Sequence, residues 1–135
     1  MIYLDSAAVV KLVRSEAESP QLVDWLVSHA GSALVSSVLV EVEVARALRR
    51  VAPTEAPGVA AVLGRMIRWK IDDAVRARAA AYPNAALRSL DAIHLATAEL
   101  VDEEGDAELE AFVTYDTRLA AAAAALGLPT VSPGW

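Results

Sequence analysis

The sequence opens with MIYLDSAAVVKLVR over residues 1–14, and this stretch decides the fold class. Met1–Leu4 is an apolar run that is too short for a helix and ends at Asp5, which predicts a buried strand. In Ser6–Arg14, apolar side chains at positions 8, 9, 12 and 13 have helical spacing, with Ser6 as a candidate N-cap. A strand followed directly by a helix is the repeating unit of parallel α/β folds.

The same alternation continues along the chain. Further strands are predicted over the short segments Ala33–Ser36, Ile67–Ile71, Phe112–Thr114 and Pro129–Val131. Helices are predicted from Ser19-Pro20 to a stop at Gly31, and over Val38–Val51, Val59–Ile67, Asp72–Tyr82, Ser89–Val101 and Thr117–Leu126, with Pro53–Gly58 as a loop. This order favours an α/β sandwich with a parallel central sheet.

Length and composition indicate a single folded domain over residues 1–135. A chain of 135 residues has the usual length of a single domain. Because 56% of its residues are hydrophobic, intrinsic disorder is excluded for most of the chain. The chain has no cysteine, so it cannot form a disulfide framework, a Cys-ligated zinc site, an iron–sulfur cluster or a thiol nucleophile.

No segment is predicted to direct the chain to a membrane. Asp5 interrupts the N-terminal apolar run, which lacks the basic region of a signal peptide. The longest uncharged stretch, Leu119–Trp135, is shorter than the roughly 20 residues of a spanning helix and contains two prolines. We therefore expect a soluble cytoplasmic protein.

The formal net charge of −6 comes from one local segment. Glu99–Glu110 contains seven of the eighteen acidic residues and no base, which leaves eleven acids against twelve bases elsewhere. We expect this segment to form a solvated helix end and a loop around Gly105. The net charge therefore does not exclude a nucleic-acid partner.

Carboxylates are the remaining candidates for catalytic or metal-binding side chains. The chain has no Gly-x-Ser-x-Gly elbow and no glycine-rich phosphate loop, and its two histidines are far apart in sequence. Sites in parallel sheets form at the carboxyl ends of strands, where Asp5 and Asp116 are predicted to lie. Clustered carboxylates suit hard divalent ions such as Mg²⁺ and Mn²⁺.

Each acidic residue also has a structural interpretation. Asp5 and Asp116 can cap the helices that follow them, and Asp91 can interact with the dipole at the start of its helix. His94, three residues after Asp91, is expected to be a packed or hydrogen-bonded core residue. Glu41 and Glu43 point about 200° apart on a helix, so at most one of them faces a given site.

Four segments together resemble the motif regions of PIN-domain proteins, specifically the VapC-type ribonuclease toxins of bacterial toxin–antitoxin pairs. The segments are MIYLDSAAVVKL, SSVLVEVEVARALR, LRSLDAIHLATA and FVTYDTRL, beginning at Met1, Ser36, Leu87 and Phe112. They occur in the expected order and span essentially the whole chain. The resemblance implies a three-layer α/β/α sandwich with a mainly parallel five-stranded sheet.

The resemblance also implies a site. Its four acids fall on Asp5, Glu43, Asp91 and Asp116 as catalytic and metal-binding residues. Glu43 is chosen over Glu41 because Arg46 follows it by three residues, as in the family pattern, although Arg46 could instead form a surface ion pair with Glu43. Supporting positions are Ser6, Thr114 and Arg46.

The function implied by the resemblance is that of a Mg²⁺- or Mn²⁺-dependent endoribonuclease. A metal-activated water would attack an RNA phosphodiester, with tRNA or rRNA as the substrate. A VapB-like antitoxin is the implied partner, and a homodimer is the implied assembly.

Three other classes compete with this interpretation. An aspartate-nucleophile phosphatase needs a second acid two residues after Asp5, where the chain has Ala7. A phospho-acceptor receiver domain needs an acid pair after the first strand and a late lysine, but the only lysines are Lys11 and Lys70. A non-catalytic binding module on a PIN-like scaffold is disfavoured because all four acids are present.

Overall fold

A parallel sheet of five strands forms the centre of the molecule. The computed structural model describes residues 1–135. The strands lie in the order β3-β2-β1-β4-β5, and every neighbouring pair is parallel. Their bounds are β1 Ile2–Leu4, β2 Leu34–Ser37, β3 Ile67–Trp69, β4 Ala111–Val113 and β5 Thr130–Val131. The predicted α/β class is confirmed, and the sheet is parallel throughout.

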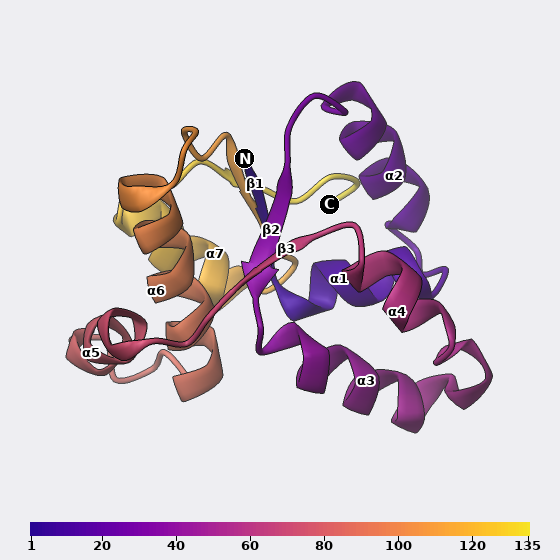
Figure 1. Ribbon diagram of the computed structural model, residues 1–135, viewed down its shortest axis with the longest axis horizontal. Coiled ribbons are helices and arrows are strands. Elements are labelled where there is room, and N and C mark those ends of the chain that lie inside the picture. Colours follow the sequence, from indigo (N-terminus) through magenta and orange to yellow (C-terminus); the bar gives the residue numbers. More distant parts are fainter.

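Helices cover both faces of the sheet, which gives the expected three layers (Figure 1). One layer contains α1 (Ser6–Val13), α2 (Ser19–Ser28), α3 (Val40–Val51) and α4 (Gly58–Leu63), with the short 3-10 helix η1 (Pro53–Glu55) between α3 and α4. The other layer contains α5 (Asp73–Ala81), α6 (Ser89–Glu104) and α7 (Thr117–Ala125). None of these helices is both long enough and apolar enough to cross a lipid bilayer.

The strands are apolar on both faces because both faces are buried. In β1, Ile2 and Leu4 pack in the cluster that contains α1, α3 and α4, whereas Tyr3 packs in the cluster under α6 and α7. In β4, Phe112 lies on the same side as Tyr3, with ring centroids 5.3 Å apart. Continuous apolar runs of this kind are typical of the central strands of parallel sheets.

The strand register brings two predicted site segments together. Leu4 is paired with Val113, so Asp5 and Thr114 follow at the same edge of the sheet. The chain runs outward from β1 through β2 to β3 and then returns to β4 on the other side of β1. The point between β1 and β4 is therefore a topological switch point, where open α/β sheets bind ligands.

Several predicted boundaries move by a few residues. The helix predicted over Ser89–Val101 continues to Glu104, since nothing in the acidic segment breaks it before Gly105. The helix predicted over Val59–Ile67 ends at Leu63, because Ile67 is already paired with Val35 in the sheet. Gly127 ends the alanine-rich helix as predicted, with a φ of 80° that favours glycine.

Candidate active site

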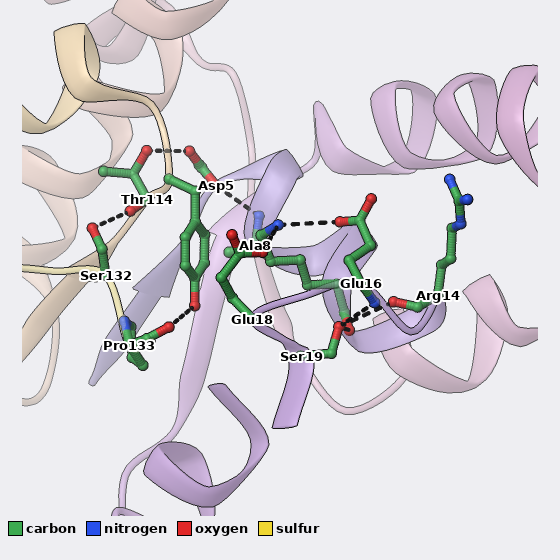
Figure 2. A network of polar contacts seen from close by, with 11 residues as sticks. Asp5, Ala8, Arg14, Glu16, Glu18, Ser19, Thr114, Ser132 and Pro133 are labelled. Atoms are coloured by element: carbon green, nitrogen blue, oxygen red, sulfur yellow. Dashed lines mark hydrogen bonds and ion pairs between the residues drawn. The ribbon is translucent and has the colours of Figure 1, made fainter. Parts of the chain in front are cut away.

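Asp5 is fixed at the end of β1 by two donors. Its exposed fraction is 4%, its Oδ1 accepts from the backbone N of Ala8 at 2.9 Å, and its Oδ2 accepts from Oγ1 of Thr114 at 2.6 Å (Figure 2). Burial raises the pKa of Asp5 above its ordinary value, and the two hydrogen bonds offset part of that rise. Of the two candidate caps, Asp5 and Ser6, it is therefore Asp5 that caps α1.

The hydroxyl of Thr114 links two of the predicted acids. It donates to Asp5, and it accepts from the backbone N of Asp116 at 3.1 Å. Asp116 caps α7, because its Oδ1 accepts from the backbone N atoms of Arg118 and Leu119. The structure thus brings Asp5, Thr114 and Asp116 to one edge of the sheet.

Asp91 lies in the first turn of α6, where the charges of other acids affect its pKa. Burial raises the pKa of Asp91, and the negative charges of Asp116 and Glu43 raise it further, against the opposing influence of His94 and Arg88. The charge of Asp91 in turn raises the pKa of Asp5. Asp91 therefore lies within electrostatic range of Asp5, Glu43 and Asp116, which come from three other segments of the chain.

Glu43 is held by a histidine from the opposite helical layer. Oε1 of Glu43 lies 2.7 Å from Nε2 of His94, and Nδ1 of His94 lies 2.7 Å from the hydroxyl of Tyr3. Tyr3 and His94 are almost completely buried, and burial raises the pKa of the Tyr3 phenol, which keeps its proton. A carboxylate only accepts hydrogen bonds, so Nε2 of His94 donates to Glu43. In the Nε2–H tautomer of the ring, Nδ1 accepts from the Tyr3 hydroxyl.

The structure separates Glu43 from Glu41. Oε1 of Glu41 lies 2.8 Å from Nη1 of Arg68, in an exposed ion pair. The alternative ion pair between Glu43 and Arg46 is not formed, because the Glu43 carboxylate bonds to His94 while Arg46 is exposed. Ser6 is partly exposed in the first turn of α1 beside Asp5.

The chemistry of this donor set fits a hard divalent ion. Oδ2 of Asp116 and Oε2 of Glu43 are free of hydrogen bonds within the chain, and carboxylates that repel one another are stabilised by a cation. No three Asp, Glu or His side chains form a ready-made ligand set. The arrangement fits Mg²⁺, which proteins usually hold by one or two carboxylates with water completing the shell.

A cavity of about 390 Å³ opens beside Asp91 and Asp116. Its other lining side chains include Arg88, Arg118 and Trp135, none of which the sequence analysis selected. The link from Tyr3 through His94 to Glu43 was likewise not predicted from the sequence. The available signals were local: Tyr3 precedes Asp5 by two residues on a strand, and His94 follows Asp91 by three residues on a helix.

Comparisons with known proteins agree with this architecture. The family model of the PIN domain matches residues 2–125. Ribonuclease VapC35 of Mycobacterium tuberculosis is 53% identical over 134 residues, which cover 99% of this chain and 98% of that protein. Ribonuclease VapC47 of the same species is 37% identical over 137 residues, with 99% and 98% covered.

A solved structure shows the same fold at low sequence identity. The crystal structure of M. tuberculosis VapC20, described as a sarcin-ricin loop cleaving toxin, aligns with a TM-score of 0.72 and 17% identity. The alignment covers 98% of this chain and 100% of that one.

Proposed function

The chain belongs to the PIN-domain family and is a VapC-type ribonuclease, and on this premise we propose that it cuts structured RNA, tRNA or rRNA, with the help of Mg²⁺ or Mn²⁺. We propose further that residues 1–135 act as one PIN-like domain. The observation that carries the proposal is the gathering of Asp5, Glu43, Asp91 and Asp116 at the carboxyl edge of β1 and β4.

The proposed roles of the acids follow from their surroundings. Asp5, Glu43, Asp91 and Asp116 would hold the divalent ion, which when bound supplies an activated water and neutralises charge on the phosphate. Thr114 and the first turn of α1 fix Asp5 in one orientation. His94 orients Glu43, so that Oε2 stays available at the site.

The remaining supporting positions have different surroundings. Ser6 begins the helix that Asp5 caps, next to the proposed metal site. Arg46 is one turn after Glu43 on α3 and exposed, which is compatible with a contact to the RNA backbone.

A VapB-like antitoxin that blocks the acidic site is the proposed partner, and a homodimer is the proposed assembly. Both proposals rest on membership of the VapC-type family. Size-exclusion chromatography with light scattering, on the chain alone and with the product of the neighbouring reading frame, tests both.

Cleavage of RNA by the purified protein tests the proposed activity. Wild type and Asp91→Asn are compared on total tRNA and on rRNA, each with Mg²⁺, Mn²⁺ or EDTA. Asp24→Asn is the matched control, since it removes one exposed aspartate from α2, a helix in the other layer. We expect metal-dependent cleavage at discrete sites by wild type and Asp24→Asn, and loss of cleavage in Asp91→Asn.

Two outcomes would contradict the proposal. Equal cleavage by Asp91→Asn would place the activity in a contaminating ribonuclease or at another site. Absence of cleavage by all three proteins on both RNA classes, with binding of the metal retained, would favour a non-catalytic binding module.

A further inference from the structure

The cavity beside Asp91 and Asp116 contains an aromatic side chain that the proposed chemistry does not use. The indole of Trp135 lines the cavity and is 62% exposed. It makes an edge-to-face contact with Tyr115, with ring centroids 6.0 Å apart and planes at 68°. The volume of about 390 Å³ is within the range of roughly 300–1,000 Å³ that is usual for small-ligand sites.

The segment that carries Trp135 is anchored to the site rather than loose. Oγ of Ser132 donates to the carbonyl of Thr114 at 2.6 Å, and the hydroxyl of Tyr115 donates to the carbonyl of Pro133 at 2.9 Å (Figure 2). The hydroxyl of Thr114 also donates to Asp5, so Thr114 contacts both the Trp135 segment and the buried acid.

The backbone next to Trp135 is also fixed. Its N donates to the carbonyl of Ser132 at 3.1 Å. Gly134 has a φ of 86°, and a Cβ at this position would lie 2.9 Å from Cβ of Gln21 on α2. A side chain held in this way loses little further freedom when a ligand stacks on it.

Two arginines line the same cavity without forming an ion pair. Arg88 precedes α6 and Arg118 lies in the first turn of α7, and both line the cavity. Like most arginines of the chain, neither forms an ion pair; only Arg68, Arg76 and Arg78 do. A planar guanidinium with its donors free is well suited to bind a phosphate group.

We propose that this cavity is a base-binding subsite for RNA, in which Trp135 stacks on a nucleobase next to the cleaved phosphodiester while Arg88 and Arg118 bind the flanking phosphates. The inference rests on the proposed function, because it assigns the substrate contacts of the same site. Aromatic stacking tolerates any base, so the subsite orders single-stranded RNA rather than reading its sequence.

Binding of a fluorescently labelled single-stranded hexaribonucleotide, titrated in EDTA so that cleavage does not intervene, tests the subsite. Trp135→Ala is expected to bind about ten- to one-hundred-fold more weakly, and Trp135→Phe, which keeps an aromatic face, is expected to remain near wild type. Val27→Ala is the control, since it trims another exposed apolar side chain on α2.

Salt dependence tests the arginines separately. Each phosphate contact contributes roughly 0.7 to the slope of log K against log salt for a single strand. Arg118→Ala and Arg88→Ala are each expected to reduce the slope by about that amount. The control Arg50→Ala, which removes an exposed arginine from α3, is expected to leave the slope unchanged.

The outcomes for the subsite and for the proposed function are distinct. If wild type cleaves RNA but Trp135→Ala binds as tightly as wild type with an unchanged KM, the subsite is refuted and the ribonuclease stands. If wild type binds RNA in a Trp135-dependent way without ever cleaving it, the subsite is supported and the proposed activity fails. Absence of any RNA binding by wild type would overturn the subsite.

Discussion

His94 and Glu43 are joined across the carboxyl edge of the sheet by a contact of 2.7 Å between Nε2 and Oε1. The two residues lie on α6 and α3, in opposite helical layers. Because His94 is itself bonded to Tyr3 in the central strand, the orientation of the partly buried Glu43 carboxylate is set from inside the core. The edge of the sheet that carries the proposed metal site is therefore coupled to the packing beneath it.

Tyr3→Phe tests this coupling. The change removes the donor to Nδ1 of His94 in the core, and we expect a loss of about 1–3 kcal/mol in the free energy of unfolding. It also frees the ring of His94, so we expect metal affinity to fall by about 10- to 100-fold. Urea unfolding and calorimetry with Mn²⁺ measure the two effects.

Nitrogen-15 spectra of the imidazole rings report the tautomer of His94, which a general loss of stability would not change. The chain has two histidines, so His94 can be separated from His29. We expect the Nε2–H tautomer in wild type and a mixture in Tyr3→Phe. Tyr82→Phe removes a different hydroxyl, which bonds to Glu99 further along α6, and it should leave the His94 signals unchanged.

The two neighbouring glutamates are expected to behave differently. Glu43→Gln should lower kcat/KM by about 10²-fold or more, because it removes a site charge and replaces the charged acceptor of His94 by a neutral amide. Glu41→Gln breaks only an exposed ion pair with Arg68, of a kind worth about 0–1 kcal/mol, and should cleave RNA like wild type. The reverse ranking would assign the site to Glu41.

Thr114→Val is expected to destabilise the protein and impair the site together. The variant removes the donor to the buried Asp5 and the acceptor for the backbone N of Asp116, with an expected loss of about 1–3 kcal/mol. The pKa of Asp5 should rise further, because a hydrogen bond to its charged form is lost. Thr130→Val, whose hydroxyl bonds to Leu128 away from the acids, is the control for thermal unfolding.

The raised pKa of Asp91 fixes the sign of a pH effect. A carboxyl group with a higher pKa when folded binds its proton more tightly in the folded state, so stability falls as pH rises from about 4 through the raised value. Without metal, Asp91→Asn should therefore be more stable than wild type at pH 7, with the difference vanishing below pH 4. Thermal unfolding in EDTA across this range measures it, and a difference independent of pH would refute the charge repulsion.

Metal addition should reverse that order. A ligand that binds only the folded state at 100 times its Kd adds about 2.7 kcal/mol of stability. We expect Mg²⁺ or Mn²⁺ to raise the Tm of wild type and Asp24→Asn and to have a much smaller effect on Asp91→Asn. Equal shifts in all three proteins would show that the ion binds elsewhere.

Local sequence patterns were sufficient to predict a parallel sheet with helices between its strands, and the resemblance to a family added the three layers. Apolar runs of three or four residues gave the strands, and helical spacing gave the helices between them, because both patterns reflect burial within a single element. The resemblance to a family supplied the four acids, and the register between β1 and β4 explains why Asp5 and Asp116 meet.

The sequence by itself determined that this chain forms a parallel α/β sheet with acids after its strands, since strand and helix patterns are local. It left open whether Asp5 or Ser6 caps α1 and whether Glu41 or Glu43 faces the site, because both members of each pair satisfy the same local rule. Only the tertiary structure decided these points and placed Trp135 beside Asp91. The direction of each side chain depends on partners that are remote in sequence, and only folding brings those partners into contact.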